Sequence, residues 1–125
     1  MAEPPLTIVI GYDEREAEAF DVCRASLLRH ASVPLHIVKL DQAALRQAGW
    51  YRREWRRVEG QRIDLGDLKP FSTDFSFTRF LIPLLNECRD EWVLYGDPDQ
   101  LWLGDIAELF EMIDPDMAVM CVKHE

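Results

Sequence analysis

Residues 6–11 read Leu-Thr-Ile-Val-Ile-Gly, and this run is the first evidence for the fold class of the chain. It is a β-branched, apolar run that ends at glycine, as is typical of a buried strand. Asp13 follows where a helix N-cap belongs, and Glu16 stands three residues later, as in a capping box. The spacing therefore predicts a helix over residues 13–31. A second apolar run, residues 35–40, completes a strand, helix and strand, which predicts a right-handed βαβ unit.

The pattern is weaker in the middle of the chain. Residues 41–49 are compatible with one or two helical turns, and residues 50–60 mix Arg, Trp and Tyr without a clean period. We therefore expect an irregular excursion over residues 50–60. Order returns at Ser72-Thr73, from which apolar residues at helical spacing predict a helix as far as Cys88. That predicted helix includes Pro83, which lacks a backbone N–H, so a kink is expected there.

The last third of the chain predicts two more strands and a helix. Residues 92–95, Trp-Val-Leu-Tyr, form a third strand. Asp105 and Glu108 form another capping-box pair, which predicts a short helix to Met112. Residues 117–122 predict a fourth strand. Alternating strands and helices favour a single α/β domain over residues 1–125, built on an open, mainly parallel, Rossmann-like sheet with flanking helices.

Composition narrows the class of protein. The chain has 125 residues, of which 48% are hydrophobic and 30% charged, as in an ordinary globular domain. No stretch approaches the roughly 18–20 apolar residues of a membrane span. No basic, apolar leader opens the sequence, and three widely spaced cysteines read as reduced thiols. We therefore expect a cytoplasmic protein without a transmembrane segment. The net charge of −9 argues against nucleic acid as a partner.

This charge is unevenly distributed. Residues 46–62 hold six arginines against two glutamates, a local net charge of +4. Residues 63–125 hold fourteen acidic residues against four basic ones, a net charge of −10. The basic segment, with its aromatic residues, is able to contact an anionic ligand, but a solvated basic loop is the more frequent case. An acidic second half that gathers carboxylates at a strand end suits a divalent cation.

The residues best suited to bind a ligand follow two of the predicted strands. Ligands of open α/β sheets bind at the carboxyl ends of the strands, where this chain places Gly11-Tyr12-Asp13 and Asp97-Pro98-Asp99. Two carboxylates one residue apart can ligate Mg²⁺ or Mn²⁺. Simpler interpretations stand beside these. Gly96-Asp97-Pro98-Asp99 is also a good type I turn, Asp13 is also a good helix cap, and Arg79 is also an ordinary surface residue.

A longer pattern resembles a known family. Residues 71–83 read Phe-Ser-Thr-Asp-Phe-Ser-Phe-Thr-Arg-Phe-Leu-Ile-Pro, and a strand, the D-x-D pair and residues 101–110, Leu-Trp-Leu-Gly-Asp-Ile-Ala-Glu-Leu-Phe, follow in order. This order resembles the donor-binding half of GT-A nucleotide-sugar glycosyltransferases, particularly those like glycosyltransferase family 8. Residues 8–13, Ile-Val-Ile-Gly-Tyr-Asp, are similar to that family's first strand and nucleoside-binding loop.

The resemblance implies a function and a set of sites. The implied activity is metal-dependent transfer of a sugar from a nucleoside-diphosphate sugar, with a UDP-sugar the expected donor, to an unknown glycan, lipid or protein acceptor. Mn²⁺ or Mg²⁺ is the implied cofactor, held by Asp97 and Asp99, with Asp97 also reaching the ribose. Arg79 matches an arginine that faces the donor's sugar and phosphates. Gly11, Tyr12 and Asp13 match the loop that holds the nucleoside.

The sequence departs from the family's pattern in three places. Gly96 replaces a bulky apolar residue, and Pro98 occupies the middle of the D-x-D motif. The later family segments that carry the acceptor site and a further metal-ligating histidine do not follow Glu125, so the chain is expected to be the truncated donor-binding portion. No catalytic residue can be named. Two rival functions remain open, a non-catalytic nucleotide-binding or interaction module and, less favoured, a phosphoacceptor receiver domain.

Overall fold

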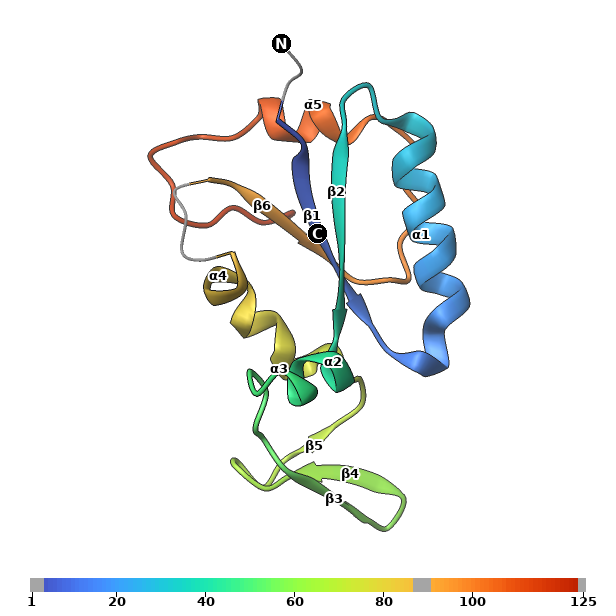
Figure 1. Ribbon diagram of the computed structural model, residues 1–125, viewed down its shortest axis with the longest axis vertical. Coiled ribbons are helices and arrows are strands. Elements are labelled where there is room, and N and C mark those ends of the chain that lie inside the picture. Colours follow the sequence, from blue (N-terminus) through green and yellow to red (C-terminus); the bar gives the residue numbers. More distant parts are fainter. Residues whose placement is uncertain (1–3, 87–90, 124–125) are drawn as a thin grey trace.

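The computed structural model describes residues 4–86 and 91–123, and its main sheet confirms the predicted α/β class. Three parallel strands stand in the order β2-β1-β6 (Figure 1). Their bounds are Leu6–Tyr12 for β1, Leu35–Asp41 for β2 and Val93–Gly96 for β6. β1 is central, so Val9 pairs with Val38 on one side and Tyr95 on the other. The carboxyl ends of β1 and β6 therefore lie next to each other.

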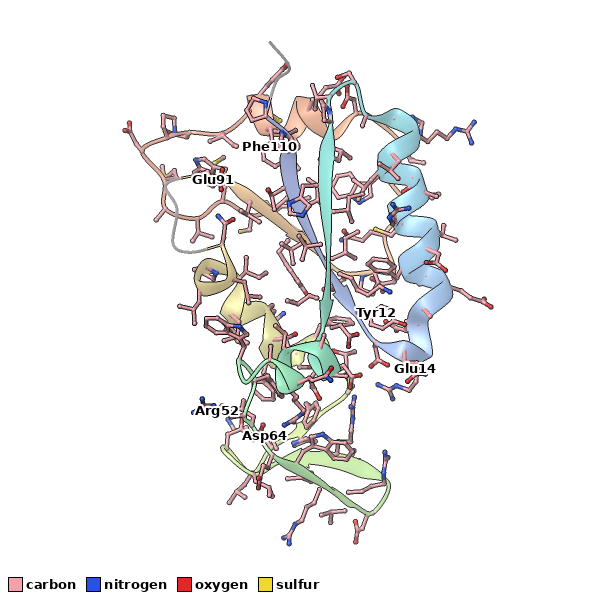
Figure 2. All side chains as sticks on the ribbon, in the orientation of Figure 1. Tyr12, Glu14, Arg52, Asp64, Glu91 and Phe110 are labelled. Carbon is pink, nitrogen blue, oxygen red and sulfur yellow. The ribbon has the colours of Figure 1, made fainter. Side chains whose placement is uncertain are left out.

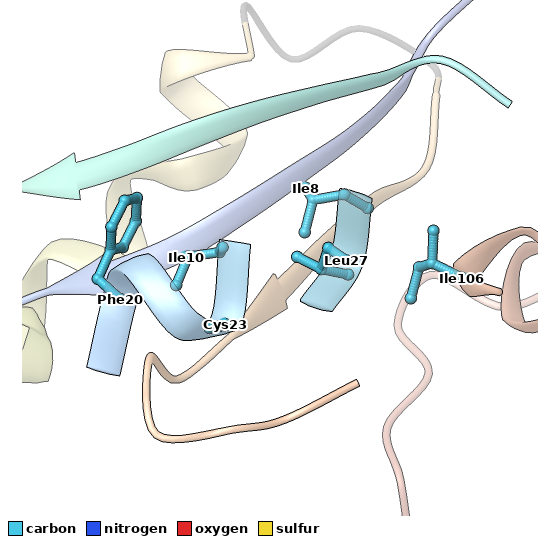
Figure 3. Packing of buried hydrophobic residues seen from close by; sticks show 6 residues of the cluster. All are labelled: Ile8, Ile10, Phe20, Cys23, Leu27 and Ile106. Atoms are coloured by element: carbon cyan, nitrogen blue, oxygen red, sulfur yellow. The ribbon is translucent and has the colours of Figure 1, made fainter. Parts of the chain in front are cut away.

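One face of this sheet is covered by α1 (Ala17–His30), which follows a short 3₁₀ turn, η1 (Glu14–Glu16). Asp13 caps this turn, because its side chain accepts a hydrogen bond from the Arg15 N–H. Figure 3 shows the core between helix and sheet, where Ile8 and Ile10 face residues of α1 and Ile106 of α5 (Ile106–Glu111). All members of this core are at most 4% exposed: Ile8, Ile10, Phe20, Cys23, Leu27 and Ile106.

The predicted helix from Ser72 to Cys88 is broken into short pieces on the other face. They are α3 (Phe75–Thr78), η2 (Arg79–Leu81) and α4 (Ile82–Leu85), while Cys88 lies outside the described residues. Pro83 explains the break, because it has no N–H to donate and the turn before it tightens to a 3₁₀ geometry. The Ile82 N–H accordingly bonds to the Arg79 carbonyl. The expected kink is therefore a change of helix type.

The irregular excursion expected over residues 50–60 is wrong in part. Residues 55–71 form a second, antiparallel sheet of β3 (Trp55–Val58), β4 (Gln61–Asp64) and β5 (Pro70–Phe71), at the lower end of Figure 1. Glu59 and Gly60, both at positive φ, close the β3–β4 hairpin. These strands were not predicted because they lack the alternating aliphatic residues that usually indicate a strand. In their place, arginine guanidinium groups pack on aromatic rings. The one or two helical turns expected within residues 41–49 are confirmed, since Gln42–Gln47 form the short helix α2.

The fourth strand predicted over residues 117–122 is wrong. The structure has no strand there, and Val119 and Val122 are 81% and 70% exposed. The apolar run satisfies the sequence pattern of a strand, but no neighbouring strand pairs with it in the described part of the chain. None of the helices formed by residues 4–86 and 91–123 has the length and apolar character needed to cross a membrane.

Candidate functional site at the carboxyl ends of β1 and β6

Gly11 and Tyr95 meet where β1 and β6 lie side by side. A Cβ atom built on Gly11 would lie 2.8 Å from the Tyr95 hydroxyl oxygen and 2.7 Å from Cγ of Phe75. Gly11 is therefore required by close packing of two aromatic side chains over the backbone. The Tyr95 hydroxyl donates a hydrogen bond to Oδ1 of Asp97 at 3.2 Å. Two predicted site residues, Gly11 and Asp97, are thus joined through a tyrosine that the sequence analysis did not select.

Asp97 and Asp99 lie on the exposed turn that follows β6, whereas Pro98 between them is buried. Burial raises the pKa of the Cys23 thiol of α1, and the negative charge of Asp99 adds to that rise. Asp97 is turned towards Tyr95. The turn that the sequence predicted is present, and both carboxylates stay open to a ligand.

Two carboxylates make a partial site for a hard cation. The described residues contain no group of three or more His, Cys, Asp or Glu side chains able to hold a metal ion. A magnesium-type site commonly uses one or two carboxylates and takes its other ligands from substrate phosphates and water. Asp97 and Asp99 fit that donor set, and a diphosphate would have to complete it.

Arg79 supplies positive charge near this turn. It is exposed at the start of η2, and its guanidinium carbon lies 5.2 Å from the ring centroid of Phe80. Burial raises the pKa of Tyr95, with Asp97 acting in the same direction, while the charge of Arg79 opposes the rise. Arg79 therefore acts electrostatically at the Tyr95–Asp97 pair. The structure brings these three side chains and Gly11 into one neighbourhood.

Asp13 lies in a different environment, because its carboxylate is 2% exposed and bonded within the protein. Oδ1 accepts hydrogen bonds from the backbone N and Nε of Arg15, both at 3.0 Å. Oδ2 accepts from Nη2 of Arg15 at 2.6 Å and from the backbone N of Asp74 at 3.1 Å. The Arg15 side chain is the main reason that the pKa of Asp13 falls to about 2. Its capping role is confirmed, and its predicted contact with a nucleoside stays a prediction.

Tyr12 turns to the opposite face of the sheet from the Gly11–Tyr95 contact. Its ring meets the Phe20 ring edge-on, with centroids 5.5 Å apart, and Lys39 Nζ lies 4.4 Å from the Tyr12 centroid. Figure 2 shows Tyr12 and Glu14 together at one end of the main sheet, with Phe110 and Glu91 at the other. Tyr12 therefore shares the sheet end of Gly11 but faces α1.

Half of the six arginines in residues 46–62 are engaged inside the protein. Arg62 of β4 forms an ion pair with Asp74, donates to the Ser72 carbonyl at 2.8 Å, and lies 3.8 Å from Oδ2 of Asp13. Its guanidinium carbon is 4.7 Å from the Phe71 ring centroid. The sequence showed the charge of Arg62 but gave no signal for its partners, which lie in two separate parts of the chain, residues 71–74 and Asp13.

Two further arginines of this segment are also engaged. Arg53 bonds to the buried carboxylate of Asp64 at 2.6 and 2.8 Å, and Arg46 donates to the Arg53 carbonyl. With Arg46, Arg53 and Arg62 engaged, residues 46–62 leave three exposed arginines against two exposed glutamates, or a net charge of +1. The interpretation as a solvated basic loop is therefore wrong for half of the arginines.

Comparison with known proteins finds a plant relative. Over 121 residues, the chain is 40% identical to the protein named "Protein CDI" of Arabidopsis thaliana. The alignment covers 97% of this chain but 42% of the relative, so the chain spans less than half of that protein's length. That name states no activity. No family model matches the chain, and no solved structure matches it.

Proposed function

We propose that this chain is the donor-binding part of a metal-dependent glycosyltransferase that uses a nucleoside-diphosphate sugar, with a UDP-sugar as the expected donor. The observation that carries the proposal is the cluster of Gly11, Arg79, Tyr95 and Asp97 at the adjoining ends of β1 and β6. Open α/β sheets bind ligands at this edge. An exposed carboxylate pair beside an arginine suits a diphosphate carried with a divalent cation.

Each residue has a role that follows from its position. Asp97 and Asp99 would hold Mn²⁺ or Mg²⁺, and the cation would neutralise the charge of the diphosphate leaving group. Arg79 would bind phosphate oxygens of the donor. The backbone of Gly11 and Tyr12 would lie along the nucleoside, because the Asp13 carboxylate is occupied by Arg15 and Asp74. The chain thus contributes donor binding and charge stabilisation.

Isothermal titration calorimetry with UDP tests this proposal. We expect UDP to bind in the presence of MnCl₂, to bind at least about tenfold more weakly without it, and to lose the metal-dependent part in Asp99→Ala. Asp116→Ala is the matched control, because Asp116 is also exposed but lies in the segment after α5. Equal UDP affinity with and without Mn²⁺ in the wild-type chain would contradict the proposal.

A turnover assay separates transfer from binding alone. The protein is incubated with UDP-sugars and Mn²⁺, and UDP release is measured. Release above that of the Asp97→Ala variant supports a glycosyltransferase. Metal-dependent binding without release would favour the alternative of a non-catalytic nucleotide-binding module.

A further inference from the structure

The side chain of Tyr95 is fixed by three contacts before it reaches Asp97. Its strand position is set by pairing with Val9 of β1. Its ring packs against the second core cluster, which is formed by Val9, Leu40, Leu45 and Tyr51. Its hydroxyl stands over Gly11, in the space that any other residue at that position would fill. A hydrogen-bond donor held in this way has little freedom to follow a moving acceptor.

The side chain of Asp97, the acceptor, is less constrained than that of Tyr95. It is exposed on the turn after β6, and the hydrogen bond from Tyr95 to its Oδ1 measures 3.2 Å. Binding of a ligand by a mobile carboxylate costs the conformational entropy of that side chain. A fixed donor on one carboxylate oxygen reduces this cost, and the other oxygen remains available to a ligand. Hydrogen bonds to the ligating carboxylates of metal sites commonly act in this way.

We propose that Tyr95 is a positioning residue that orients the Asp97 carboxylate for a divalent cation, with Gly11 providing the space for its hydroxyl. This inference rests on the proposed function, because it takes Asp97 as a ligand of the cation. Tyr95 itself touches neither cation nor donor. It acts through Asp97, and it couples the end of β1 to the turn after β6. Gly11 thereby has a packing role in the site that is separate from any approach of its backbone to a nucleoside.

The test measures Mn²⁺ binding directly. Electron paramagnetic resonance of free Mn²⁺ gives the dissociation constant of MnCl₂ in the presence of saturating UDP for the wild-type chain and for Tyr95→Phe. We expect about a tenfold weaker Mn²⁺ affinity in Tyr95→Phe. Tyr51→Phe is the matched control, because it removes the same hydroxyl from a tyrosine that is 5% exposed and belongs to the same core cluster. Its Mn²⁺ affinity is expected to equal that of the wild type.

A double-mutant cycle separates positioning from general destabilisation. If Tyr95 acts through Asp97, then Tyr95→Phe should not weaken Mn²⁺ binding further in an Asp97→Asn background. An equal loss in both backgrounds would overturn the proposal, as would a Tyr95→Phe variant that lowers only the melting temperature. If the wild type binds Mn²⁺ and Tyr95→Phe binds it with the same affinity, this inference alone is overturned. Absence of wild-type binding overturns the proposed function and this inference with it.

Discussion

The carboxylate of Asp13 accepts a hydrogen bond from the backbone N–H of Asp74, 61 positions later in the chain, at 3.1 Å. This bond joins the end of β1 to the start of α3, and Arg62 of β4 lies 3.8 Å from the same carboxylate oxygen. The residue that the sequence singles out as a helix cap is therefore also the point where the two sheets are connected.

Asp13 is expected to make stability depend on pH in a defined window. Its pKa falls from 3.8 to about 2 in the folded protein, so its contribution is complete above about pH 4 and is lost as the pH falls through 2. The contribution is about 1–2 kcal/mol, reduced because the Arg15 partner is largely exposed. Urea unfolding between pH 2 and 6 measures it. Asp13→Asn should flatten this part of the curve, whereas Asp116→Asn should not.

Arg62→Met is expected to destabilise the fold by about 2–4 kcal/mol, because it removes the partner of Asp74 and a donor to the Ser72 carbonyl. Methionine keeps an apolar stem between Trp55 and Phe71. Chemical denaturation gives the free energy of unfolding. Arg57→Met is the control, since Arg57 is exposed and donates to the Gly60 carbonyl at 3.3 Å, and it should cost less than about 0.5 kcal/mol. Similar losses in the two variants would contradict the role given to Arg62.

Gly11→Ala is expected to cost about 1–3 kcal/mol, because the new Cβ would lie 2.7 Å from Phe75 and 2.8 Å from the Tyr95 hydroxyl. Gly104→Ala provides the comparison, since nothing lies within 4 Å of a Cβ at that position. That variant should change stability by less than about 1 kcal/mol in either direction. Thermal unfolding of the two variants in one buffer checks the difference, and equal melting temperatures would argue against close packing at Gly11.

Cys23 and Cys121 are expected to differ in reactivity. Burial raises the pKa of Cys23, which is 1% exposed, whereas Cys121 is exposed. Because the thiolate is the reactive form, a brief treatment of the native protein with iodoacetamide should label Cys121 well before Cys23. Peptide mass spectrometry measures the two sites separately. Equal labelling rates of Cys23 and Cys121 in native buffer would contradict the packing of α1 on β1.

The sequence predicted the main sheet well because the signals there are local. The periodicity of β1, β2 and β6, the cap at Asp13 and the cap at Asp105 each depend on residues close in the chain, and all of these appear in the structure. The strand predicted over residues 117–122 does not appear, because no neighbouring strand pairs with it in the described part of the chain. The small sheet was missed, because its apolar surface comes from Trp55 and Phe71 with an arginine between them. Such a layer has no alternation of aliphatic residues.

The candidate site was predicted as a set of positions but not as a set of contacts. Gly11, Arg79 and Asp97 were selected by motif, and the structure gathers them near Tyr95. Tyr95 was predicted only as part of a strand. The sequence does not show which side chain of that strand will contact the glycine of a neighbouring strand. Partners of Asp13 and Arg62 depend on contacts between distant parts of the chain, and no spacing rule describes these.

The ion pairs around Asp13 also bear on how the protein opens. A sheet of two four-residue strands and one two-residue strand has little independent stability. Because it is attached through Arg62 to Asp74 and Asp13, we expect the two sheets to unfold as one cooperative unit. Amide hydrogens in β4 should therefore exchange with solvent through the same large opening that exposes β1, and the edge of the candidate site should stay ordered for as long as the main sheet does.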